Sequence, residues 1–165
     1  SACRKLYRKS FVGDIRFEEG RKVNEDSFFV FCCFLKQPVV VIRNMVIYHT
    51  VRNPDSASQA EFSEKFFDIL YFAERKRELI SERFPELQAE VNNIIIKANF
   101  SMLYAFCKTN EKKYRKDVKK CIKTVKTLKK YFVPLNSREK KFFFIVTNNL
   151  YFVYKIYYNI KHKKK

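Results

Sequence analysis

Apolar residues recur at helical spacing through most of the chain after residue 58. The first predicted helix follows a capping box, Ser58-Gln59-Ala60-Glu61, in which the serine and glutamate bond to each other's backbone. Its apolar positions are Phe62, Phe66, Ile69, Leu70 and Ala73. A second helix begins at Pro85, a residue that suits the first helical position. One face of it carries Leu87, Val91, Ile94, Ile95, Ala98 and Met102.

Two more helices are predicted in the last third. One runs from about Glu111 to Tyr131. Its apolar side consists of Tyr114, Val118, Cys121, Ile122, Val125 and Leu128. Pro134 ends this helical pattern, and Asn136 with Glu139 three residues later forms a capping box for a fourth helix, which runs towards His162.

The opening region has a different pattern. Asn24 is a good helix N-cap, which places Glu25 and Asp26 in the first helical turn beside free backbone N–H groups. Five apolar residues would fix this helix in a core: Phe28, Phe29, Phe31, Phe34 and Leu35. A continuous apolar run typical of a buried strand follows and ends at Ile47-Tyr48-His49, before a polar turn that contains Arg52. The predicted class is therefore α+β, mainly helical.

Composition narrows the possible folds. The length of 165 residues suits one modest domain, and 47% hydrophobic residues suffice for a core. Two glycines and four prolines leave few turns for a β-rich fold. The five cysteines are odd in number and lack Cys-x-x-Cys spacing, which argues against a disulfide framework or zinc site. We interpret them as buried free thiols in a reducing cytoplasm.

Positive charge is concentrated near the C-terminus. Residues 110–165 hold 18 Lys and Arg against three Asp and Glu, out of a net charge of +18 for the chain. Six lysines at spacings of four and three share one face of the third helix: Lys112, Lys116, Lys119, Lys123, Lys126 and Lys130. Each like-charged pair costs about 0.2–0.5 kcal/mol in an isolated helix. We predict an anionic partner rather than a merely solvated face; anionic lipid is favoured over nucleic acid.

The last predicted helix is strongly apolar over residues 142–154, where only Thr147, Asn148 and Asn149 are polar. This segment is shorter than the about 20 apolar residues that cross a bilayer. Tyrosines surround Lys155, a composition typical of a membrane interface. The alternative is a helix that packs in the core and leaves its basic tail in solvent. Both interpretations hold if one face of the helix packs in the core and the other face contacts the membrane.

An ordered series of short motifs covers about the first sixty residues. It runs Lys5-Leu6-Tyr7-Arg8 with Phe11, Ile15-Arg16-Phe17, Glu19-Gly20-Arg21, Glu25-Asp26, and Ile47-Tyr48-His49 with Arg52 and Ser56. This series resembles the last part of the catalytic domain of family 2 glycosyltransferases, GT-A fold enzymes that build bacterial capsule and related polysaccharides. The resemblance implies a remnant of a GT-A α/β domain with short strands over residues 1–57, followed by a helical bundle over 58–165.

The resemblance also implies an activity. In the family, the aspartate of the Glu-Asp pair is the general base that activates the acceptor hydroxyl in an inverting sugar transfer, so Asp26 would be catalytic and Glu25 would position the acceptor. His49 and Arg52 would contact the donor diphosphate or its metal. Without the resemblance, the two acids are ordinary first-turn residues and His49 is structural.

The expected partners follow from the same source. The nucleotide-sugar donor half of the family, with its Asp-x-Asp metal motif, is not in this sequence, so the chain alone is expected to transfer no sugar. No cofactor or metal site is predicted here, whereas Mg²⁺ or Mn²⁺ is expected in a full-length enzyme, with a glycan acceptor. The expected location is the cytoplasmic face of the bacterial inner membrane. The alternative function is a basic helical module that binds anionic membrane or nucleic acid without catalysis.

Overall fold

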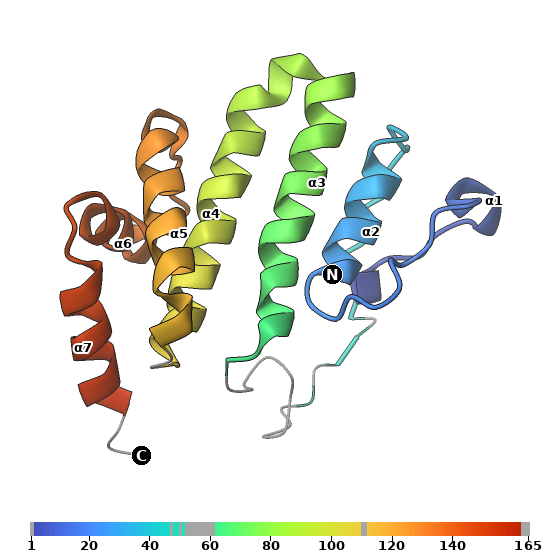
Figure 1. The fold of residues 1–165 in the computed structure, drawn as a ribbon. Helices are drawn as coiled ribbons and strands as arrows, with labels where there is room; N and C mark the ends of the chain where they lie inside the picture. The colour runs from blue at the N-terminus through green and yellow to red at the C-terminus, as the bar shows by residue number, and fades with distance from the viewer. Residues whose placement is uncertain (1, 47, 50, 52–61, 110–111, 163–165) are drawn as a thin grey trace. The chain divides into compact units, whose positions relative to one another are not determined.

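The computed structural model describes residues 2–46, 48–49, 51, 62–109 and 112–162 (Figure 1). The chain forms two compact units, residues 1–60 and 61–165. The sequence-based boundary at 57/58 lies outside the described residues. The described residues are mainly helical, as predicted, and contain no β-strand.

The first unit is organised around one helix. A 3₁₀-helix, Ala2–Arg4, and a short helix α1, Lys9–Val12, precede α2, Glu25–Phe34. Phe28, Phe29 and Cys33 are the buried residues of α2, whereas Phe34, which was predicted to lie in the core, is exposed. The ring of Phe29 stacks on that of Phe17 at 4.6 Å between centroids and meets Tyr7 edge-on at 5.6 Å. These aromatic contacts fix the orientation of α2 within the unit.

A lysine ties the two helices of this unit together. The ammonium of Lys36, just beyond α2, donates to the carbonyl oxygens of Phe11 at 2.9 Å and Val12 at 3.2 Å. These carbonyls lie at the C-terminal end of α1, where a cation is favoured. Gly13 follows with φ 55°, a left-handed conformation that glycine adopts without strain.

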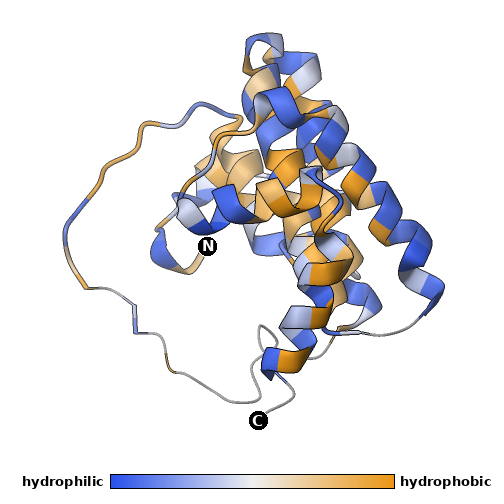
Figure 2. Cartoon of the chain, turned by 90° about the vertical axis from the view of Figure 1, so that its left-hand side faces the viewer, coloured by the Kyte–Doolittle hydropathy of each residue, from blue (hydrophilic) through white to orange (hydrophobic). Residues whose placement is uncertain are grey.

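The strand predicted before His49 does not form. Over the described residues 38–46 the chain is irregular, and Figure 2 draws it as a trace with several hydrophobic positions. Val39 is 96% exposed and Ile42 is 87% exposed. A strand needs a neighbour to pair its backbone groups, and the described part of the chain supplies no second strand. The predicted strand is therefore absent from the described residues 38–46.

The second unit contains five α-helices among its described residues. They are α3 (Asp68–Arg83), α4 (Gln88–Cys107), α5 (Arg115–Thr127), α6 (Ser137–Thr147) and α7 (Tyr151–His162). A 3₁₀-helix, Glu64–Phe67, leads into α3, and two others, Lys112–Tyr114 and Lys129–Tyr131, flank α5. The predicted helix from Glu111 to Tyr131 is thus confirmed over Arg115–Thr127, with a 3₁₀-helix on either side. The capping box at 58–61 lies outside the described residues.

Helix α4 is the centre of the second unit. It packs against α3, α5 and α7, and Figure 1 shows α3 and α4 side by side as a helical hairpin. Pro85 begins the 3₁₀-helix that turns the chain into α4. Val91, Ile95 and Met102 are fully buried, as their spacing predicted, whereas Leu87 and Ile94 are partly exposed. These three helices surround one apolar helix, so the burial of α4 organises the unit.

The predicted fourth helix is two helices. α6 ends at Thr147, and Asn149 follows in a left-handed conformation, φ 63°. The N–H of Leu150 donates to the Ile145 carbonyl at 2.9 Å and that of Asn149 to the Val146 carbonyl at 3.4 Å. This is the Schellman arrangement that ends helices. The continuous helix expected from Asn136 towards His162 is therefore wrong, because Asn149 takes the position usually held by glycine.

The start of α6 is as predicted. The N–H of Glu139 donates to Oδ1 of Asn136 at 3.0 Å, and the Glu139 carboxylate in turn accepts from the N–H of Leu135 at 2.7 Å. The reciprocal bond thus reaches one residue further back than in the usual capping box.

Replacing this cap should weaken the second unit. We expect Asn136→Ala to lower the free energy of unfolding by about 1 kcal/mol, because the N–H of Glu139 loses its acceptor. Urea denaturation followed by circular dichroism measures this loss. The neighbouring Ser137→Ala is the control and should change stability by a few tenths of a kcal/mol at most. Equal losses in the two variants would contradict the assigned cap.

Candidate functional site

The two predicted catalytic carboxylates lie where the sequence placed them, in the first turn of α2. Glu25 and Asp26 are half-buried, and Phe28 and Phe29, in the next turn, are buried. The first N–H groups of a helix have no partner within it and favour negative charge. The arrangement presents two carboxylates at a helix start that an aromatic core holds in place.

The cap of this helix differs from the prediction. Asn24 occupies the N-cap position with φ 70°, and its side chain makes no capping hydrogen bond. Its carbonyl oxygen accepts the first helical bond from the N–H of Phe28 at 2.9 Å. Asparagine tolerates this left-handed conformation better than most residues, so Asn24 turns the chain into α2 through its backbone.

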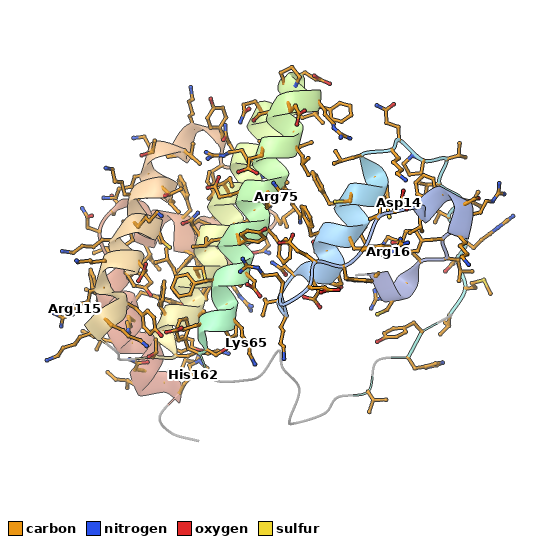
Figure 3. The ribbon with its side chains drawn as sticks, turned by 45° about the vertical axis from the view of Figure 1, so that its right-hand side comes forward. Asp14, Arg16, Lys65, Arg75, Arg115 and His162 are labelled. Carbon is orange, nitrogen blue, oxygen red and sulfur yellow. The ribbon has the colours of Figure 1, made fainter. Side chains whose placement is uncertain are left out.

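The structure describes one of the two predicted donor-binding residues. His49 is exposed in irregular chain. Arg52 lies outside the described residues. The described part of the opening unit thus brings together the two predicted catalytic acids, Glu25 and Asp26. Figure 3 labels a third carboxylate of this unit, Asp14, which is exposed.

The six predicted lysines lie on the side of the α5 segment opposite its buried face. Five are exposed, and Lys126 is half-buried with its ammonium donating to Oδ1 of Asn149 at 2.6 Å. The ammonium of Lys130 lies 4.8 Å from the ring centroid of Tyr131. Within the described part of the chain none of the six forms an ion pair. The positive charge on this face is therefore not neutralised by the protein there.

The opposite face of α5 is apolar. Val118, Cys121 and Val125 are buried against the core around α4. Burial raises the pKa of the Cys121 thiol to about 12. Burial raises the pKa of the Cys107 thiol as well. Cys107 and Cys121 are thus buried packing residues in their neutral form, as the sequence predicted, and Cys33 is buried too. The same prediction is wrong for Cys3, which is exposed, and for Cys32, which is half-buried.

Helix α7 has two different faces. The sequence left open whether this helix packs in the core or contacts a membrane. Tyr151 is fully buried, and its hydroxyl donates to the Leu103 carbonyl of α4 at 2.7 Å. Large apolar residues on the other side are between 50% and 64% exposed: Phe152, Val153, Ile156, Tyr157 and Ile160. Their spacing of one, three, one and three residues places them on one side of a helix. An unpartnered apolar face of this size is typical of an interaction surface.

A cavity of about 250 Å³ lies between the end of α4, the start of α5 and α7. Lys112, Arg115 and Lys155 line it, together with aromatic and aliphatic side chains. Figure 3 labels Arg115 at the outer side of the first turn of α5. No periodic pattern predicted this grouping, because Lys112 and Arg115 at the start of α5 meet Lys155 of α7 only in the folded chain.

Comparisons with protein-family models, with curated proteins and with solved structures return no match to this chain. The described residues contain no cluster of histidine, cysteine, aspartate or glutamate suited to a metal ion. Among the same residues, no helix combines the length and apolar character needed to cross a bilayer. Any function is therefore inferred from four features of the described residues: the carboxylate pair, the lysine face, the apolar side of α7 and the cavity.

The buried thiols predict a loss of stability in alkali. A thiol whose pKa is raised on folding stabilises the native state below its unfolded pKa, and this contribution disappears as pH rises through the folded pKa. For Cys121 the window extends from 9.0, the ordinary value, to about 12. We expect Tm to fall across this range in differential scanning calorimetry. A Cys121→Ala variant should start from a lower Tm but lose less of it in alkali.

An identical decline in both proteins would contradict this assignment. Thiol labelling gives an independent check in the native state. Cys3 is exposed and should react with an alkylating reagent first. Cys33, Cys107 and Cys121 are each 1% exposed and should react only once denaturant opens the core.

Proposed function

We propose that residues 1–60 supply the acceptor side of an inverting glycosyltransferase active site, with Asp26 as general base. The observation that carries the proposal is the start of α2, where Glu25 and Asp26 remain half-exposed while the residues behind them are buried. A base must reach a substrate proton and must also be held in position. The helix start meets both requirements, and it agrees with the motif series that resembles the family 2 enzymes.

The chemistry assigned to the pair is simple. The acceptor hydroxyl attacks the anomeric carbon of a nucleotide-sugar, and the bond between that carbon and the diphosphate breaks. Asp26 takes the hydroxyl proton as the new glycosidic bond forms, while Glu25 orients the acceptor by accepting a hydrogen bond. The diphosphate leaves with the bond's electron pair. His49 and Arg52 contact the diphosphate, and a divalent metal is held elsewhere in the enzyme.

The exposed run before His49 supports the idea that this unit works with another segment. Val39, Val41 and Ile42 are each more than 70% exposed, although continuous apolar runs are typical of strands buried in parallel sheets. A GT-A sheet that carries the nucleotide-binding half would pair with this segment and cover it.

Neutralising the proposed base should abolish transfer. In an enzyme that joins this chain to a donor-binding half, we expect Asp26→Asn to lower kcat by about 10²–10⁴-fold, the usual contribution of a general base. Donor binding should be retained, because Asp26 is not assigned to the donor. Radiolabelled sugar transfer and calorimetric titration of the nucleotide-sugar measure the two properties.

The matched control is Asp14→Asn, which removes the same charge from an exposed position of the same unit. It should leave kcat unchanged within about twofold, since exposed surface substitutions rarely matter. If Asp26→Asn retains full activity, Asp26 has no role as base. If both variants lose activity together, the loss reflects the charge of the unit rather than a specific proton acceptor.

A second function is proposed for the helical unit: docking on an anionic membrane surface. The specific observation is that α7 leaves one apolar face exposed near the start of α5, whose lysines carry unneutralised charge. Interfacial helices bind by burying an apolar face at the head-group boundary while cations contact anionic lipid. Such docking would bring a transferase close to a lipid-linked acceptor.

Reversing the lysine charges should weaken this docking. We expect Lys116→Glu, Lys119→Glu and Lys123→Glu together to cost at least about 3 kcal/mol in binding to phosphatidylglycerol-containing vesicles, at about 1 kcal/mol per cation. Vesicle sedimentation at low salt measures the loss. A control that reverses Arg4, Arg8 and Lys9 matches the change in net charge. Equal losses of vesicle affinity in the two variants would show that binding depends only on net charge. Retained binding by the lysine variant would show that the lysine face is only solvated.

A further inference from the structure

The cavity beside α7 combines positive charge with an apolar mouth. Lys112, Arg115 and Lys155 line it, and the described lining residues include no carboxylate. Its volume of about 250 Å³ is below the about 300–1,000 Å³ of typical small-molecule pockets. The cavity therefore fits an anionic head group rather than a complete nucleotide-sugar.

The position of Lys155 is fixed by a hydrogen bond. Its ammonium donates to the carbonyl oxygen of Thr109 at 2.5 Å, which holds it against the end of the α4 segment. Burial lowers the pKa of Lys155, so an anion that enters the cavity would compensate for lost hydration. Arg115, from the first turn of α5, adds a planar guanidinium that can bind two phosphate oxygens at once.

The apolar side of the cavity continues onto the exposed face of α7. Phe152 and Ile156 line the cavity, and both belong to the exposed apolar face that also contains Val153, Tyr157 and Ile160. A ligand with a charged end and a hydrocarbon chain can therefore place its charge among the three cations and its chain along α7. A free anion would use only the first of these features.

We propose that this cavity binds the phosphate group of an anionic membrane lipid that carries a phosphomonoester, with the lipid chain lying along the exposed face of α7. A phosphomonoester carries about 1.5 to 2 negative charges at neutral pH, which suits three cations better than a singly charged diester does. The inference rests on the proposed docking of the helical unit and adds a lipid preference to it.

The test compares two vesicles of equal surface charge. One contains phosphatidylcholine with phosphatidic acid, and the other contains phosphatidylcholine with phosphatidylglycerol. The 165-residue chain should bind the first about fivefold more tightly or better, the equivalent of one further cation contact. Lys112→Gln with Arg115→Gln should remove this preference.

The control pair is Lys119→Gln with Lys123→Gln, which removes the same charge from α5 away from the cavity. It should weaken binding to both vesicles, by about fivefold per charge, and leave the ratio unchanged. Equal binding of the unmodified chain to both vesicles would overturn the cavity proposal and leave docking intact. No binding to either vesicle would overturn both.

Two further results would reassign the site. Inorganic phosphate that raises Tm through Lys112 and Arg115, in a chain without vesicle preference, would make the cavity a site for free phosphate. Duplex DNA that binds through the same two residues more tightly than either vesicle would make it part of a nucleic-acid surface. Either result contradicts a lipid site.

Discussion

The buried hydroxyl of Tyr151 is the interaction on which the arrangement of the C-terminal helices depends. It donates to the Leu103 carbonyl of α4 at 2.7 Å and lies 3.6 Å from the Cys107 sulfur. A buried phenol without a partner would cost about 1–3 kcal/mol, so this bond holds α7 in one rotation against α4. Burial accordingly raises the pKa of Tyr151. The constraint decides which side of α7 faces the core and which side faces out.

Everything proposed for the second unit follows from that rotation. With Tyr151 inward, Phe152 and Ile156 border the cavity and Val153 and Ile160 are exposed. The lysines of α5 face away from the core for a comparable reason, because Val118 and Val125 occupy its buried side. The exposed charge and the exposed apolar surface thus come from two amphipathic helices, α5 and α7. Their inner faces pack in the same core around α4. The first unit adds the carboxylates at the start of α2, which the aromatic contacts of Phe29 hold in place.

Much of this could be predicted from local pattern. The periodicity around Val118 and Cys121 identified the α5 helix and its two faces, Asn136 identified the start of α6, and the sequence placed Asp26 in a first helical turn. The failures have physical causes. Strand pairing is not a local property, so the apolar run around Ile42 could not show whether a partner exists. The stop at Asn149 depends on a left-handed conformation that asparagine allows without requiring. The cavity forms only where α7 meets the chain between the end of α4 and the start of α5.

The first measurement to make is nucleotide-sugar turnover, on the 165 residues alone and on the same residues joined to a donor-binding half. If Asp26 is the general base, the joined protein transfers sugar to a glycan acceptor. The 165 residues alone, whose sequence has no Asp-x-Asp motif, then show no turnover. Turnover by the chain alone would contradict this assignment. So would a joined protein that binds the nucleotide-sugar and still transfers no sugar.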